Sequence, residues 1–395
     1  MPPSPPPVDV LTPHDTTPDE IESRAELDWH LQARSLAGLT VQGLRLDADP
    51  VPDLTDVDVT DTLFAGCHFA SREIEADLVR RGAHVVPPFA ELPYPTHPPY
   101  LYLPEDLAAG FETRGFAGMY DTVVYEHFRA QGGALPEVRE AFAQRLHDHA
   151  IDNALADFSR RWVTMHGSGT IVGVMGGHAE RRGSPAYRQA AALGWSLAGA
   201  GRLVITGGGP GVMEAANLGA FLGARPAGDL DAAIDLLATA PHYADHDRYT
   251  AAALEVRARY APVAHPDPDH PGGLAIPTWL YGHEPANLFA GRIAKYFCNA
   301  IREDTILRLA RGGIVFAPGR AGTVQEIFQA ATKTFYGTDG ASGAYVFLGR
   351  AFWTETLPVE ALLRPLLAVS PVGDLSGTVH VTDDVHDAVR LLTAD

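Results

Sequence analysis

Short apolar runs alternate with longer amphipathic segments through the second half of the chain. The apolar runs, which are typical of strands buried on both faces, cover 170–175, 202–206, 273–276, 313–317, 345–348 and 378–381. Helical periodicity predicts helices over 185–199, 211–223, much of 228–260, 285–310, the residues that follow 323, and 384–392. Strands that alternate with helices at this spacing indicate an α/β fold, in which a parallel sheet is covered by helices on both faces.

The first 165 residues have a different pattern. Six prolines among the first thirteen residues predict a disordered tail over 1–22. A strand over 62–67, a helix over 72–81 and a strand over 83–86 then predict a small βαβ-like unit, and a proline-rich connection leads to a long helix over 136–162. We therefore divide the chain into a tail at 1–22, an N-terminal α/β region at 23–165 with a hypothetical regulatory role, and a larger domain at 166–395.

A glycine-rich loop connects the predicted strand at 202–206 to the next helix. It contains Gly207, Gly208, Gly209, Gly211 and Met213. Glycines allow the backbone to approach a ligand closely, and the free amides at a helix N-terminus favour a phosphate. The alternative interpretation is a tight turn with no ligand.

A second loop connects the strand at 313–317 to an amphipathic helix. Its residues are Pro318, Gly319, Arg320, Ala321, Gly322 and Thr323, and Glu326 follows in what the pattern predicts to be the first helical turn. The Gly322 amide and the Thr323 amide and hydroxyl are suited to a phosphate. Alternatively, Thr323 and Glu326 form a capping box whose only role is to stabilise the helix.

Both loops follow strands, so a parallel sheet would bring them to the same edge, where such sheets bind ligands. Two phosphate-type loops and a nearby acid suggest a nucleotide whose sugar lies beside a carboxylate. Neither loop has the Gly-x-Gly-x-x-Gly spacing of a dinucleotide site. A mononucleotide is therefore the expected ligand.

The two loops, in this order, resemble the motifs Gly-Gly-Gly-x-Gly-x-Met and Pro-Gly-Gly-x-Gly-Thr-x-x-Glu of the LOG family of Rossmann-like phosphoribohydrolases, and the resemblance covers about residues 168–395. Gly176 and Gly177 fit the family's early ligand loop. The long N-terminal extension and the insertion at about 225–270 are closer to the larger nucleotide 5′-monophosphate nucleosidases of that family. The resemblance implies a Rossmann-like fold, a homodimer or higher homo-oligomer, and a catalytic pair formed by Arg302 and Glu326, with Arg308 and Arg311 close to the first of these in sequence.

The chain departs from the family pattern at two positions. Arg320 replaces the second glycine of the motif, so it either strains the backbone, if that position needs positive φ, or adds a phosphate contact. Glu214 follows Met213, where a glycine is frequent. These departures keep open the alternative of a noncatalytic nucleotide-binding or sensor protein with the same fold.

Family members are often labelled lysine decarboxylases, a chemistry that needs a pyridoxal phosphate Schiff base. Lys295 and Lys333 are the only lysines, and both lie in helical patterns, where Lys295 is interpreted as ordinary helix surface. We therefore expect neither that activity nor any cofactor. Neither lysine follows a glycine, so a P-loop is excluded as well.

Charge and composition limit the partners further. Acidic residues outnumber basic ones 49 to 30, for a formal net charge of −19, which argues against binding to nucleic acid or to an anionic membrane. We expect a cytoplasmic protein, because no signal-peptide pattern and no apolar run of about 20 residues is present. Cys67 and Cys298 are too few for a disulfide framework, and we interpret His265 to His270 as an acidic loop, so no metal is expected.

These inferences combine into one function hypothesis. The chain hydrolyses the N-glycosidic bond of AMP-like nucleoside 5′-monophosphates and releases free base and ribose 5-phosphate. Glu326 stabilises the oxocarbenium-like sugar and orients or deprotonates water, Arg302 holds Glu326 or the substrate, and the second loop anchors the phosphate. His283 and Glu284 are candidates for contact with the base or ribose, although Glu284 before Pro285 is equally a simple helix start.

Overall fold

The computed structural model describes residues 19–394, apart from residue 90 and the segments 261–271 and 281–283. The contacts divide the chain into two compact units. Of the described residues, the larger unit contains Tyr102–Glu126 and those from Phe158 onward, and the smaller unit contains 19–101 together with His127–Asp157. The helices α5 (Tyr120–Ala130) and α6 (Val138–His166) each contribute residues to both units.

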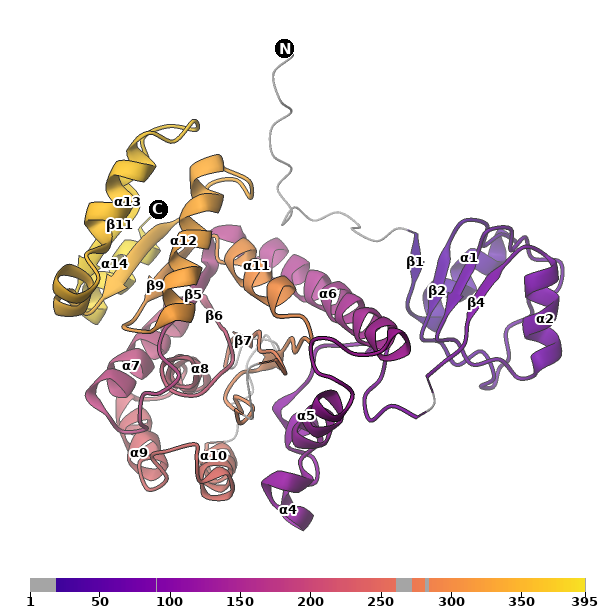
Figure 1. Cartoon of the computed structure of the whole chain (residues 1–395), viewed down its shortest axis with the longest axis horizontal. Coiled ribbons are helices and arrows are strands. Elements are labelled where there is room, and N and C mark those ends of the chain that lie inside the picture. Colours follow the sequence, from indigo (N-terminus) through magenta and orange to yellow (C-terminus); the bar gives the residue numbers. More distant parts are fainter. Residues whose placement is uncertain (1–18, 90, 261–271, 281–283, 395) are drawn as a thin grey trace. The chain divides into compact units, whose positions relative to one another are not determined.

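The larger unit is built on a seven-stranded sheet in which every pairing is parallel (Figure 1). Its strand order is β11-β10-β9-β5-β6-β7-β8. The strands are β5 (Ile171–Met175), β6 (Leu203–Thr206), β7 (Leu274–Ala275), β8 (Arg292–Ile293), β9 (Gly313–Phe316), β10 (Ala344–Leu348) and β11 (Val379–Thr382). All residues of β5, β6 and β9 are buried, as the apolar runs predicted, and the expectation of a doubly covered parallel sheet is confirmed.

Helices connect and cover these strands. They are α7 (Pro185–Gly199), α8 (Val212–Phe221), α9 (Ala227–Leu237), α10 (His246–Arg259), α11 (Asn299–Leu309), α12 (Ala321–Tyr336), α13 (Val359–Ala368) and α14 (Val385–Thr393). The short helices α3 (Pro104–Ala108) and α4 (Phe111–Arg114) precede the first strand of this sheet. None of the helices in the described part of the chain is long and apolar enough to cross a membrane.

The helix α8 packs unusually closely against α7 along its middle. A Cβ at Gly194 would lie 2.0 Å from the carbonyl oxygen of Ala216, and a Cβ at Gly219 would lie 2.0 Å from that of Ala191. Only glycine allows two helix backbones to approach this closely. The packing places the start of α8 beside the end of β5, where the Val212 amide donates a 3.2 Å hydrogen bond to the Gly177 carbonyl.

The smaller unit has a four-stranded parallel sheet in the order β1-β2-β3-β4. Its elements are β1 (Glu20–Ile21), α1 (Arg24–Gln32), β2 (Thr40–Gln42), β3 (Leu63–Ala65), α2 (Arg72–Arg80) and β4 (His84–Val86). The predicted βαβ-like unit is confirmed as β3-α2-β4. The sequence pattern did not reveal α1 or β2, and Glu20–Ile21, which the predicted tail included, form β1; residues 1–18 of that tail lie outside the described residues.

The predicted helix over 285–310 is wrong in its first half. Only 299–309 is helical as α11, and the preceding segment forms the short strand β8 and irregular backbone. Residues 285–290 are all buried, so they lack the polar face of a surface helix. The side chain of Asn287 holds this irregular backbone in place. Its Oδ1 accepts a hydrogen bond from the Phe289 backbone amide at 3.1 Å, and its Nδ2 donates one to Oδ1 of Asn217 at 2.9 Å.

Lys295 is buried and lies outside any helix, which corrects its interpretation as helix surface. Its ammonium forms an ion pair with Asp121, a residue 174 positions away in the sequence. The Trp279 indole donates to the same carboxylate oxygen at 2.8 Å, and the ammonium lies 5.1 Å from the centre of that ring. Burial of such a charge pair costs desolvation energy. Removal of either partner would leave the other charge buried without compensation, which is strongly destabilising.

We expect Lys295→Met to lower the free energy of unfolding by about 3–5 kcal/mol, because it leaves the Asp121 carboxylate buried without its counter-charge. The double variant Lys295→Met/Asp121→Leu should recover at least half of that loss. Denaturant unfolding, followed by tryptophan fluorescence, measures both. A double variant that is no more stable than the single variant would contradict the buried pair as the cause.

Candidate functional site

A cleft with a volume of about 1130 Å³ opens at the carboxyl ends of β5 and β9. The sheet continues from β5 through β6 to β8 on one side and from β9 to β11 on the other, so β5 and β9 are neighbours at the point where the strand order reverses. Parallel sheets bind ligands at such a point. The cleft is lined by Gly176, Gly177, His178, Ala179, Glu180, Met213, Leu280, Glu284, Arg302, Glu303, Pro318, Gly319, Arg320, Ala321, Gly322, Thr323, Gln325, Glu326 and Phe352.

The second loop, residues 318–323, forms one wall of the cleft. The Gly177 amide donates to the Pro318 carbonyl at 3.1 Å, which joins this loop to the one after β5. The first residues of α12, Ala321 to Thr323, line the cleft, and the first amides of a helix have no intrahelical partner. The wall therefore offers free N–H donors at the positive end of a helix dipole.

Arg320 adopts an extended conformation with φ −117° and ψ −155°. An arginine takes this backbone without strain, so replacement of the family's glycine has no conformational cost. The expectation that Arg320 strains the backbone is therefore wrong. A phosphate contact remains a prediction.

The capping-box interpretation of Thr323 and Glu326 is also wrong. Helix α12 begins at Ala321 with Arg320 as its cap, and no side chain caps it. Thr323 is therefore inside the first turn, and Glu326 lies in the second turn rather than the first. Thr323 fits there because Gly319 has no side chain: a Cβ on Gly319 would lie 2.2 Å from the Thr323 hydroxyl oxygen.

The glycines of the first loop, Gly207 to Gly211, are not among the residues that line the cleft, whereas Met213 is. A Cβ at Gly207 would lie 2.7 Å from Nη2 of Arg302, and one at Gly209 would lie 2.9 Å from Oε2 of Glu284. Gly208 and Gly211 both have φ +72°, a conformation that favours glycine. The absence of side chains in this loop therefore leaves room for two charged side chains of the cleft.

Arg302 and Glu326 are brought together by α11 and α12. Nη1 of Arg302 lies 3.7 Å from Oε1 of Glu326, and the guanidinium is held by the carbonyls of Ile276 at 3.0 Å and Gly207 at 3.4 Å. Burial raises the pKa of Glu326 to about 7, against the opposing effect of Arg302 and with a further contribution from Glu303. A carboxyl group with this pKa can act as an acid or a base near neutral pH.

Glu303 is a cleft residue that the sequence analysis missed. Asn299 donates to one of its carboxylate oxygens at 2.8 Å, and Gln325 donates to the other at 2.6 Å. The contact with Gln325 joins α11 to α12 beside the pair of Arg302 and Glu326. The signal in the sequence was weak, because Glu303 is the immediate neighbour of Arg302 and consecutive residues of a helix face different directions.

His178 is a second cleft residue that was missed, and it faces Glu284. Its Nδ1 lies 3.9 Å from Oε1 of Glu284, and its side chain is 51% exposed. Burial raises the pKa of Glu284 against the opposing effects of His178, Arg302 and Lys295. His283, the other candidate from this segment, lies outside the described residues, as does the whole of 265–270.

Glu214, the second departure from the family pattern, is buried beneath the first loop. Its carboxylate accepts from Arg182 Nε at 2.9 Å, from the Tyr187 hydroxyl at 2.9 Å and from the Tyr249 hydroxyl at 2.7 Å. These partners come from the segment before α7, from α7 and from α10. Glu214 therefore ties three segments to the start of α8 and does not line the cleft.

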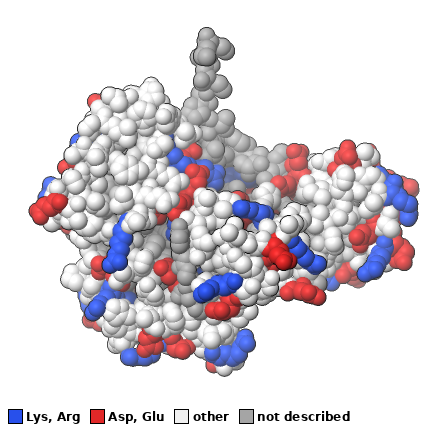
Figure 2. Space-filling model, in the orientation of Figure 1, with Lys and Arg blue, Asp and Glu red and all other residues white. Residues whose placement is uncertain are grey.

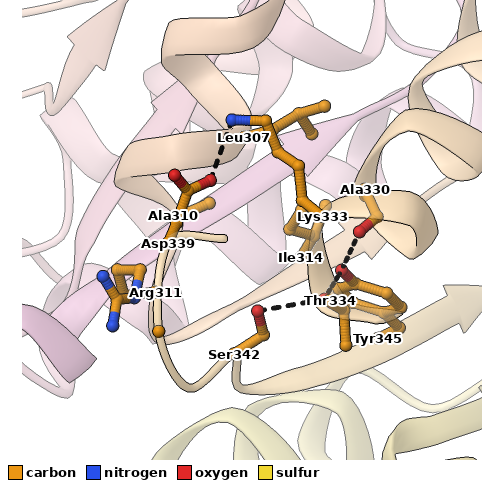
Figure 3. Close-up of a pocket in the computed structure, with 11 residues that line it drawn as sticks. Leu307, Ala310, Arg311, Ile314, Ala330, Lys333, Thr334, Asp339, Ser342 and Tyr345 are labelled. Atoms are coloured by element: carbon orange, nitrogen blue, oxygen red, sulfur yellow. Dashed lines mark hydrogen bonds and ion pairs between the residues drawn. The ribbon is translucent and has the colours of Figure 1, made fainter. Parts of the chain in front are cut away.

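The two lysines also lie away from the cleft lining. Lys333 belongs to α12, and Figure 3 shows its ammonium directed at Asp339 in a separate small pocket. The two groups are 2.8 Å apart, and Asp304 lies 3.0 Å from the same ammonium. With Lys295 paired to Asp121, the structure presents both lysines as ion-pair partners rather than as candidates for a Schiff base.

Charges of both signs are interspersed over the face shown in Figure 2. The positive groups of the cleft are Arg302, Arg320 and the helix N-terminus of α12. Among the residues that the structure describes, no three His, Cys, Asp or Glu side chains are arranged to hold a metal ion.

Residues 169–228 match the model of the SLOG cluster4 family, which belongs to the SLOG superfamily that includes LOG-like proteins. The matched segment contains β5, Gly176 and Gly177, α7, β6 and the first loop. The match suggests a nucleotide-related function for this part of the chain. No curated protein matches the chain.

We expect the pKa of Glu326 to respond to both of its charged neighbours. Arg302→Gln should raise it above its value of about 7, because a cation that favours the carboxylate is lost. Glu303→Gln should lower it, because a like charge is removed. Infrared or carbon-13 NMR titration of the carboxyl group measures both shifts. Asp304→Asn is the matched control, since Asp304 pairs with Lys333; shifts of the same sign in Arg302→Gln and Glu303→Gln would contradict this electrostatic arrangement.

Proposed function

We propose that this chain hydrolyses the N-glycosidic bond of nucleoside 5′-monophosphates and releases free base and ribose 5-phosphate. The observation that carries the proposal is the pair formed by Arg302 and Glu326 in the cleft, next to the N-terminus of α12. The SLOG match supports a nucleotide as the ligand class. The specific reaction rests on the side chains of the cleft.

The phosphate group is bound by the second loop. The amides of Ala321 to Thr323 and the positive end of the α12 dipole favour a dianion, and Arg320 adds a guanidinium on the same wall. This contact is remote from the reacting carbon. Its binding energy orients the ribose over the floor of the cleft, where Arg302 and Glu326 lie.

Cleavage of the bond between C1′ and the base develops positive charge on the sugar. Glu326, one helical turn beyond the phosphate-binding amides, stabilises this oxocarbenium-like state as a carboxylate and takes a proton from the attacking water. Arg302 keeps the carboxylate in place and lowers its pKa against the effect of burial. The opposing effects leave Glu326 able to exchange a proton near neutral pH.

A noncatalytic sensor of the same fold is the alternative hypothesis. A site that only binds a nucleotide does not need a buried carboxyl group with a pKa of about 7 beside the sugar position. That feature favours the enzyme. Tight nucleotide binding without base release would favour the sensor.

Glu326→Gln should reduce base release by roughly 10²–10⁴-fold while it leaves the fold intact, because the amide cannot accept the proton of water. Chromatography after incubation with AMP, GMP, CMP and UMP measures the released base. Asp304→Asn, whose carboxylate points to Lys333 on the outside of the same helix pair, should retain full turnover. Unchanged turnover in Glu326→Gln would contradict the proposed role.

Arg320→Ala should raise KM for AMP by roughly 10-fold with a much smaller change in kcat, because a charge-assisted contact to the phosphate is lost far from the reacting carbon. Arg320→Lys should restore part of the affinity. Initial rates over a range of AMP concentrations separate the two constants. A loss in kcat alone would argue against a phosphate contact.

A further inference from the structure

Among the carboxyl groups that line the cleft, Glu284 is the one on the side of the first loop. Its Oε2 occupies the space left by the missing side chain of Gly209, and Nη2 of Arg302 occupies the corresponding space at Gly207. Met213 lies between them, since its side chain would meet a Cβ built on either glycine. Glu284, Met213, Arg302 and Glu326 therefore form a continuous row, with one carboxyl group at each end.

We propose that Glu284 is the general acid that protonates the departing nucleobase, and that His178 returns a proton to it from solvent. The proposal rests on the function proposed above and adds the step that activates the leaving group. Hydrolysis of a glycosidic bond commonly uses two carboxyl groups that flank the scissile bond, one for the leaving group and one for the water or the sugar. Here Glu326 serves the sugar and the water, and Glu284 serves the base.

Three cationic or titratable groups act electrostatically on Glu284 from neighbouring segments. They are His178 from the loop after β5, Arg302 from α11, and Lys295 from the segment after β8. All three favour the carboxylate, yet burial outweighs them and the pKa of Glu284 is raised. A carboxyl group whose pKa is raised in this way holds its proton to a higher pH than an ordinary glutamic acid, which suits it to donate that proton to a ring nitrogen of the base.

His178 provides the connection to solvent. Its side chain is about half exposed, and its Nδ1 lies 3.9 Å from Oε1 of Glu284, close enough for one small side-chain movement or one water to link them. Glu284 itself is 29% exposed, so most of it is shielded from water. A half-exposed imidazole beside a shielded acid is a natural proton relay.

The step balances in protons and electrons. The bond between C1′ and the base nitrogen breaks, and its electron pair goes to the base. The Glu284 proton passes to the base, and water forms the new bond to C1′ while it loses its own proton to Glu326. Glu284 then recovers a proton through His178 as Glu326 releases one, so the net reaction consumes one water and leaves the protein unchanged.

The test compares two substrates with the full-length protein. AMP has a base that departs poorly without protonation, whereas 4-nitrophenyl β-ribofuranoside 5-phosphate has a leaving group that departs as a stable anion. We expect Glu284→Gln to lower kcat for AMP by roughly 10²–10⁴-fold and to lower kcat for the nitrophenyl substrate by less than about 5-fold. Glu326→Gln should impair both substrates, because both need the stabilised sugar and the activated water.

The pH dependence is a second readout that a merely structural role would not change. A general acid must be protonated, so kcat for AMP should fall as the pH rises through the pKa of Glu284, and Glu284→Gln should abolish this alkaline decline. His178→Ala should lower kcat for AMP and leave the nitrophenyl rate almost unchanged. Asp304→Asn serves again as the carboxylate-to-amide control, and circular dichroism checks that each variant is folded.

The outcomes separate this proposal from the one on which it rests. Wild-type protein that cleaves neither substrate would overturn the proposed function and this step with it. Wild-type protein that is active, with Glu284→Gln equally impaired on both substrates or on neither, would overturn the general-acid role alone. Selective loss on AMP would support both.

Discussion

The position of the Arg302 guanidinium is the constraint on which the candidate site depends. Two backbone carbonyls hold it, one from Gly207 after β6 and one from Ile276 after β7, so the sheet itself fixes this cation. Its free edge faces Glu326, and it also contributes to the electrostatic environment of Glu284. This cation lowers the pKa of both carboxyl groups while burial raises it, and burial prevails in each, so that the pKa of Glu284 is raised and that of Glu326 is about 7.

The glycines around the cleft act mainly by the space that they leave. Gly207 and Gly209 make room for Arg302 and Glu284, and Gly319 makes room for the Thr323 hydroxyl. Gly194 and Gly219 allow α7 and α8 to pack backbone against backbone and so position the first loop. The close approach of the first loop's backbone to a phosphate stays a prediction, since none of its glycines lines the cleft, and the role that the structure shows for Gly207 and Gly209 is to leave room for side chains of the cleft.

A chain with a formal net charge of −19 has an unfavourable overall field for an anionic ligand. The cleft compensates locally, with Arg320 and the α12 amides on one wall and Arg302 on the floor. Since the wall is the N-terminus of a helix, much of this positive potential comes from backbone dipoles rather than from ionised side chains. Neither lysine lines the cleft: Lys333 pairs with Asp339, and Lys295 pairs with Asp121 while it also acts to lower the pKa of Glu284.

The sequence by itself determined the class of the larger fold and the position of both glycine loops. Strands such as β5, β6 and β9 are buried on both faces, so their apolar runs are continuous and easily recognised, and the loops follow from the strands. The short strands β1 and β2 escaped detection: β1 fell inside the predicted tail, and both strands are defined by pairing with segments about 20 residues or more away in the sequence.

Only the tertiary structure decided how the chemical groups are arranged. It placed Lys295 in a buried pair with Asp121, started α12 before Thr323, and brought Glu303 and His178 to the cleft beside the expected residues. Each of these outcomes depends on a partner that is remote in sequence or on the burial of a polar group. A local pattern encodes which face of a helix is apolar, but the pKa and the partner of a buried charge are set by whatever the rest of the chain packs against it.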